Sequence, residues 1–124
     1  MVIAGAGAIG SLARYGLNNV VGRWLGKGFP YGTLAVNLIG CFCLGLLMEL
    51  ALSSEWISRE LRLALGVGFF GAFTTFSTFG VETMRLLEAG AWPQVAMNVL
   101  ANVILGLALA WLGFTLARAL LAAT

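Results

Sequence analysis

Four long apolar stretches, separated by short polar connectors, fill almost the whole sequence. They cover residues 2–21, 32–52, 61–87 and 94–120. Each stretch reaches the roughly 20 residues that an α-helix needs to cross the hydrocarbon core of a bilayer. The pattern therefore predicts an all-α membrane protein in which four transmembrane helices form a single domain over residues 1–124.

The connectors carry residues that are typical of membrane surfaces and helix ends. Trp24, Trp56 and Trp92 each lie near the end of an apolar stretch, where amphipathic rings prefer the bilayer interface. Ser58 stands just before the third stretch, and we expect its side chain to cap the helix that begins there.

Composition also favours lipid as the solvent for this chain. Hydrophobic residues make up 60% of it and charged residues only 10%, against roughly 25% charged in ordinary soluble domains, and the mean hydropathy is +0.97. The net charge of +2 includes no basic run, which argues against a nucleic-acid partner, and the chain has no histidine, which excludes His-based catalysis. We predict a multi-pass protein of a cell membrane that is not an enzyme.

The cations of the connectors are balanced between the two sides of the predicted bundle. One side carries three and the other side three, namely Arg59, Arg62 and Arg118 against Arg23, Lys27 and Arg85. A Lys/Arg excess in the cytoplasmic loops normally sets the orientation of a membrane protein. Its absence predicts insertion in both orientations and pairing of two copies as an antiparallel, dual-topology homodimer. Chance is the alternative explanation for a balance of so few charges.

The middle of the third stretch favours an interruption of its helix. Residues 66–80 read GVGFFGAFTTFSTFG, and the small and hydroxyl residues between Gly71 and Thr78 are poor helix formers. A broken helix at this depth is tolerated only where it is buried in protein or lines a wet cavity. Such a break frees carbonyls for a cation and N–H groups and hydroxyls for an anion. The alternative is a kinked, continuous helix whose hydroxyls bond to the preceding turn.

Phe76 and Phe79 lie three residues apart, so on a helix they share a face. The edges of aromatic rings carry partial positive charge, and a pair of edges attracts an anion without holding it as tightly as a lysine would. Conduction needs this compromise, because the ion must both enter and leave. Packing of the two rings in a core is the alternative interpretation.

Polar side chains also occur inside the other stretches. Asn37 lies in the second, and Asn98 and Asn102 lie one turn apart in the fourth. Their amides offer N–H donors either to an anion or to a neighbouring helix. Arg14, midway along the first stretch, is expected to face a water-filled cavity or to pair with a carboxylate, for which Glu82 is the candidate.

The sequence GAFTTFSTF at residues 71–79, followed by Gly-Val-Glu, resembles the Fluc/CrcB family of microbial fluoride channels. The segments GTLAVNLIG at residues 32–40 and GSLARY at residues 10–15 resemble the same family. The number and order of apolar stretches agree with it over essentially the whole chain.

This resemblance implies a channel in a bacterial or archaeal plasma membrane that exports fluoride passively and so protects the cell from its toxicity. An antiparallel homodimer would hold two fluoride pathways. Phe76 and Phe79 would line each pathway, Asn37 would donate hydrogen bonds to fluoride, and Ser77 and Thr78 would form a polar track beside the rings.

The resemblance further implies a structural sodium ion at the centre of the dimer. The backbone carbonyls of Gly71 and Thr74 from both subunits would bind it, and Arg14 would stand at the mouth of a vestibule. The expected partners are thus fluoride, membrane lipid and a second copy of the chain.

Two other classes of protein fit the size and hydropathy. A small proton-coupled multidrug exporter of four helices needs a carboxylate in its first helix, but the first stretch carries Arg14 and no acid. A scaffold subunit without transport activity would need only the helix packing that small residues allow.

Overall fold

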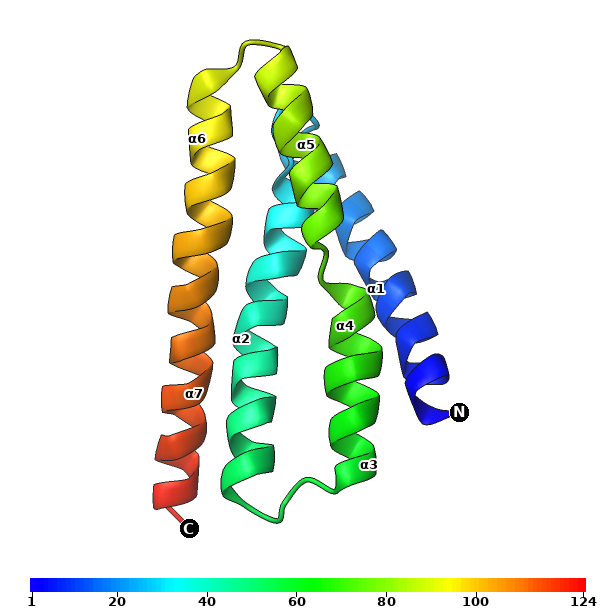
Figure 1. Cartoon of the computed structure of the whole chain (residues 1–124), viewed down its shortest axis with the longest axis vertical. Helices are drawn as coiled ribbons and strands as arrows, with labels where there is room; N and C mark the ends of the chain where they lie inside the picture. The colour runs from blue at the N-terminus through cyan, green and yellow to red at the C-terminus, as the bar shows by residue number, and fades with distance from the viewer.

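The computed structural model describes all 124 residues, and all its regular elements are helical. The chain forms four long helical segments, of which the third is broken (Figure 1). Residues 59–73 and residues 92–122 are each divided into three helical elements that follow one another without a gap. In chain order the elements are α1 (Val2–Leu25), α2 (Tyr31–Ser53), α3 (Arg59–Arg62), the π-helix η1 (Leu63–Phe70), α4 (Gly71–Phe73), α5 (Phe76–Glu88), α6 (Trp92–Leu100), the π-helix η2 (Ala101–Leu105) and α7 (Gly106–Ala122).

The segments form a bundle in which α2 lies between α7 and the α3–α4 run (Figure 1). The most extensive contacts are those of α2 with α7 and of α1 with η1. Helix α1 crosses the bundle at a slant and passes behind α5 in this view. The sequence-predicted cap is confirmed, because Ser58 Oγ accepts a hydrogen bond of 3.2 Å from the Leu61 N–H.

Three helical segments are long and apolar enough to cross a membrane, namely Tyr31–Ser53, Arg59–Glu88 and Trp92–Ala122. Helix α1 is not among them, although its 24 residues give it the necessary length. Arg14, Asn18 and several glycines lower its hydropathy. The structure therefore supports a membrane protein, and a membrane span for α1 stays a prediction.

The break in the third segment lies at Thr74 and Thr75. Both residues adopt extended conformations, with φ/ψ of −80°/158° and −151°/113°. Helix α5 begins again at Phe76, and Thr75 caps it by accepting a hydrogen bond of 3.3 Å from the Thr78 N–H. The predicted interruption is confirmed, and the alternative of a continuous, kinked helix is wrong.

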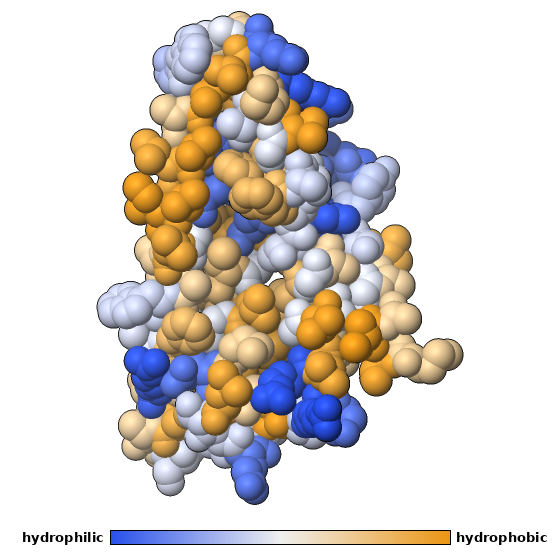
Figure 2. Space-filling model, viewed as in Figure 1, coloured by the Kyte–Doolittle hydropathy of each residue, from blue (hydrophilic) through white to orange (hydrophobic).

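Much of the surface is apolar. Only 16 of the 124 residues are buried, and large side chains such as Leu12, Leu107 and Trp111 are exposed. Figure 2 shows hydrophobic residues over much of the visible face, with many of the hydrophilic ones toward its two ends. Such a surface suits contact with lipid or with another apolar chain better than contact with water.

Glycines allow α2 and α7 to pack with their backbones in contact. A Cβ atom on Gly113 would overlap the Phe42 carbonyl oxygen and the Leu46 nitrogen, and one on Gly45 would overlap the Ala110 carbonyl oxygen. Close backbone approach at small residues is the usual basis of helix packing in bilayers.

We expect Gly113→Ala to lower the free energy of unfolding by about 3 kcal/mol, because overpacking against backbone atoms cannot be relieved by side-chain rotation. Thermal unfolding in detergent measures the loss. Gly5→Ala on α1 is the matched control, since its added methyl group meets nothing within 4 Å, and it should leave stability unchanged or slightly raised. Equal melting temperatures for the two variants would contradict the packing argument.

Candidate functional site

The side chain of Asn37 on α2 holds the break in the third segment. Its Oδ1 accepts a hydrogen bond of 2.8 Å from the Thr75 N–H, and its Nδ2 donates one of 3.1 Å to the Thr75 carbonyl. The amide thus satisfies both backbone groups of a residue that has left the helix, as buried backbone groups require. The second donor of Asn37 is also used, in a 3.0 Å hydrogen bond to Asn102 Oδ1.

A chain of hydrogen bonds continues from Asn37 into the fourth segment. Asn102 Nδ2 donates to Asn98 Oδ1 and to the Asn98 carbonyl, at 3.1 and 2.9 Å. Asn98 Nδ2 donates to Thr83 Oγ1 at 2.9 Å, and this hydroxyl donates to the Phe79 carbonyl at 2.7 Å. We call Asn37, Asn102 and Asn98 the amide chain. Of the two sequence-based interpretations of Asn98 and Asn102, the structure shows hydrogen bonding between helices.

A cavity of about 270 Å³, the ring cavity, lies against one side of the break. Phe76 and Phe79 both line it, with ring centroids 5.5 Å apart and ring planes tilted by 47°, so their predicted shared face is confirmed. Phe76 is 83% exposed, which leaves its ring open to a neighbouring molecule. The other residues of the lining are Asn37, Gly40, Cys41, Leu44, Thr74, Thr75, Asn102 and Val103.

A second cavity, of about 190 Å³, also meets Thr75 and contains Arg14. Its remaining lining residues are Asn18, Thr33, Val36 and Thr78. The alternative interpretation, an ion pair of Arg14 with Glu82, is wrong: Glu82 Oε1 accepts a 2.9 Å hydrogen bond from Thr33 Oγ1, and the only salt bridge in the chain joins Arg118 to Glu49. Arg14 therefore faces a polar cavity, as the other interpretation expected.

Neither Ser77 nor Thr78 lines the ring cavity of the single chain. Thr78 lines the Arg14 cavity and accepts a 2.9 Å hydrogen bond from Thr75 Oγ1. Ser77 is exposed and lines neither cavity. Their membership of a polar track stays a prediction.

The break changes the hydrogen bonding of Gly71 and Thr74. In an unbroken helix the Thr75 N–H would donate to the Gly71 carbonyl and the Thr78 N–H to the Thr74 carbonyl. Here they donate to the side chains of Asn37 and Thr75 instead. Both carbonyls thus lose their usual donors, which fits the predicted use of these oxygens for a cation.

A model of the family described as "CrcB-like protein, Camphor Resistance (CrcB)" matches residues 1–114. The chain belongs to the CrcB family. Three similar CrcB relatives carry the name fluoride-specific ion channel FluC. The protein from Geobacter metallireducens is 52% identical over 118 residues, which are 95% of each chain. That from Pelobacter propionicus is 54% identical over 112 residues, 90% of this chain and 87% of the relative. That from Dehalococcoides mccartyi is 49% identical over 113 residues, 91% of this chain and 87% of the relative.

The residue that sequence reasoning missed in this CrcB chain is Thr75. It is 8% exposed, joins Asn37 to α5 and lines both cavities at the break. A hydroxyl residue directly before a helical run is a recognised capping signal. Thr75, directly before Phe76, offered that signal within the motif.

Proposed function

We propose that this CrcB-family chain is a subunit of a fluoride-selective channel, through which fluoride leaves the cell passively and which thereby limits fluoride toxicity. The relatives named as fluoride-specific ion channels support this proposal. The observation that carries it is the placement of two aromatic rings and an amide around a break in a membrane helix. The function is ion conduction and not enzymatic.

The lining of the ring cavity suits a small, strongly hydrated anion. Crossing lipid without water is prohibitive for fluoride, so a pathway must supply donors in place of its hydration shell. The edges of Phe76 and Phe79 offer positive charge to the anion, and the cavity contains no charged residue. The hydroxyls of Thr74 and Thr75 donate to the Phe70 carbonyl and to Thr78 Oγ1, so they would have to turn from these acceptors to reach the ion. A neutral lining lets the ion leave again, which a fixed lysine or arginine would hinder.

Asn37 has no free donor in this structure, because one N–H faces the Thr75 carbonyl and the other faces Asn102. We infer that fluoride replaces Asn102 Oδ1 as the acceptor for Asn37, while the bonds to Thr75 keep the break in place. Ser77 and Thr78 would supply further hydroxyl donors where a second copy completes the pathway.

The channel would be a homodimer of opposite orientation in a bacterial or archaeal plasma membrane, with four spans per chain. A sodium ion at its centre would be held by the carbonyls of Gly71 and Thr74 from both subunits. The donors that these carbonyls lose at the break support this assignment, since hard cations prefer oxygen ligands. Arg14 would raise the anion concentration in a vestibule beside the break.

Fluoride efflux from proteoliposomes tests the function. We expect rapid, electrogenic loss of fluoride with little loss of chloride, followed with ion-selective electrodes, while empty liposomes retain both ions. The runner-up, a proton-coupled multidrug exporter, would instead exchange an organic cation for protons. Purified protein that performs this exchange and releases no fluoride would refute the proposal.

A further inference from the structure

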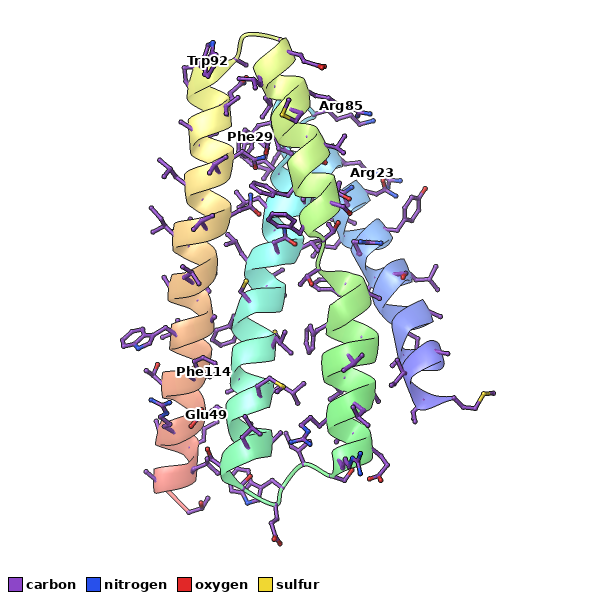
Figure 3. All side chains as sticks on the ribbon, in the orientation of Figure 1. Arg23, Phe29, Glu49, Arg85, Trp92 and Phe114 are labelled. Carbon is purple, nitrogen blue, oxygen red and sulfur yellow. The ribbon has the colours of Figure 1, made fainter.

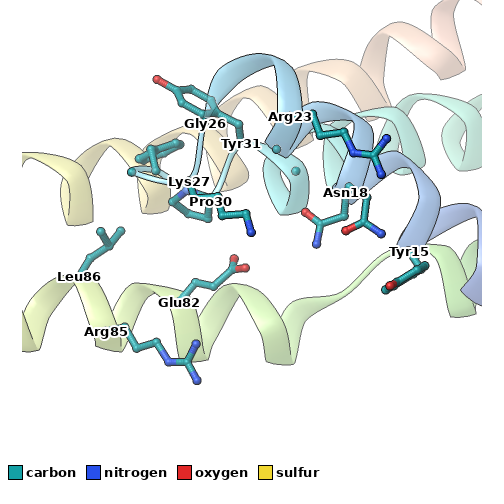
Figure 4. A pocket seen from close by; sticks show the side chains of 15 residues that line it. Tyr15, Asn18, Arg23, Gly26, Lys27, Pro30, Tyr31, Glu82, Arg85 and Leu86 are labelled. Atoms are coloured by element: carbon teal, nitrogen blue, oxygen red, sulfur yellow. The ribbon is translucent and has the colours of Figure 1, made fainter.

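A third cavity, of about 750 Å³, lies at the end of the molecule where α1 and α5 terminate (Figure 4). Its walls come from the last turns of α1, from the loop that leads to α2, and from α5. Most of its lining residues are polar, charged or glycine: Tyr15, Asn18, Asn19, Gly22, Arg23, Gly26, Lys27, Gly28, Phe29, Pro30, Tyr31, Gly32, Glu82, Arg85 and Leu86. We call it the basic cavity.

Three of the seven cationic side chains of the protein line this one cavity: Arg23, Lys27 and Arg85. None of them forms a salt bridge. Glu82 is the only carboxylate in the lining; its Oε1 accepts a hydrogen bond from Thr33 Oγ1, and its Oε2 is buried without a hydrogen-bond partner. The formal charge of the lining is therefore positive, and like charges gathered around a cavity favour a bound anion.

Neutral donors add to these charges. The amides of Asn18 and Asn19 line the same cavity. The backbone N–H groups of Lys27, Gly28 and Phe29 make no backbone hydrogen bond. Figure 4 shows the loop that carries them facing the α5 helix across the cavity. The lining thus contains donor groups on α1 and on this loop, which suits a ligand with several acceptor oxygens.

We propose that the basic cavity binds a phosphate-class oxyanion. Guanidinium groups match the paired oxygens of a tetrahedral oxyanion with parallel hydrogen bonds, and the volume far exceeds that of a halide. The oxyanion has two sources, free phosphate and the headgroup of an anionic phospholipid. Trp24 and Trp92 are exposed at this end of the molecule, and Figure 3 shows Arg23, Arg85 and Trp92 toward the same end. This places the cavity near the interface level of a bilayer, where both sources are present.

A ligand in the basic cavity would lie on one approach to the break. Asn18 lines both this cavity and the Arg14 cavity, which ends at Thr75. Binding itself does not depend on the proposed channel function. Only a further effect on fluoride flux rests on it.

Thermal unfolding of the purified protein in detergent tests binding. Inorganic phosphate should raise the melting temperature by about 5 °C over sodium chloride at equal ionic strength, because a ligand of the native state stabilises it by mass action. Arg23→Gln, Lys27→Gln and Arg85→Gln should each raise the half-saturating phosphate concentration about tenfold. Arg59→Gln, on α3 at the opposite end of the molecule (Figure 1), is the matched control and should respond as the original protein does.

A second titration separates the two sources of the oxyanion. If short-chain phosphatidylglycerol raises the melting temperature and removes the response to phosphate, a lipid headgroup occupies the cavity. If the phosphate response persists unchanged with this lipid, the ligand is the free oxyanion. The proposal fails if phosphate and chloride give the same melting temperature, or if the three variants respond to phosphate as Arg59→Gln does. Fluoride efflux, measured separately, is the test of the channel and not of this site.

Discussion

Asn37→Asp is expected to reduce fluoride flux by about a hundredfold or more. The substitution keeps the size of the side chain and the acceptor for the Thr75 N–H. It turns the donor atom into an acceptor that faces the Thr75 carbonyl and Asn102 Oδ1. The permeating fluoride then meets no donor at position 37 and is repelled by the carboxylate, and a barrier raised by about 2.8 kcal/mol corresponds to a factor of a hundred in rate. Efflux from proteoliposomes, normalised to the amount of folded protein, measures the loss.

Gln94→Glu is the matched control for this variant. Gln94 lies in the first turn of α6, lines none of the three cavities and takes no part in the amide chain, so the same change from amide to carboxylate should leave fluoride flux within about twofold of the original, as surface substitutions usually have small effects. Normal flux through Asn37→Asp would show that neither the support of the break nor donation by Asn37 limits conduction.

The second large effect is expected at Phe79, where isoleucine should lower fluoride flux by about tenfold or more while the fold and assembly survive. Isoleucine keeps apolar bulk but lacks the positive edge of the ring that lines the ring cavity beside Phe76. An edge contact with an anion that contributes about 1.4 kcal/mol to the rate-limiting step corresponds to this factor. Fluoride efflux gives the rate, and size-exclusion chromatography reports whether assembly is unchanged.

Phe114→Ile on α7 controls for the loss of an aromatic ring. Phe114 lies near Glu49, toward the end of the molecule away from Trp92 (Figure 3), and does not line the ring cavity. Its replacement should leave flux nearly unaltered. If both phenylalanine variants conducted like the original protein, the ring-edge mechanism would be wrong, although the channel itself would stand.

Hydropathy and local residue chemistry predicted the helical class, the segments and the interruption, because these depend on properties that neighbouring residues share. The apolar stretches had to be helices for their backbone groups to be satisfied in lipid. Ser58 was expected to cap a helix because a serine directly before a helix can accept a hydrogen bond from an N–H of its first turn. Thr74 and Thr75 lie in a run of small and hydroxyl residues, and the break is located there. Even the shared face of Phe76 and Phe79 followed from helical spacing.

Contacts between distant segments could not be read in this way. Asn37 meets Thr75 across 38 positions, and it meets Asn102 across 65, whereas the sequence left Asn102 with two equal interpretations. Of the two interpretations of Arg14, the ion pair with Glu82 is not formed, because Glu82 reaches Thr33 instead. Spacing along one helix says which residues share a face, but not which face of another helix lies opposite.

By itself, the sequence determined that this chain is a set of apolar helices with a polar break in the third, since hydropathy and helix propensity are properties of short segments. Only the tertiary structure decided that an amide from α2 supports the break, and that rings and arginine line separate cavities which meet at Thr75. An asparagine side chain carries the same N–H donors wherever it lies. The packing of α2 against the third and fourth segments decides which acceptor each of these donors meets.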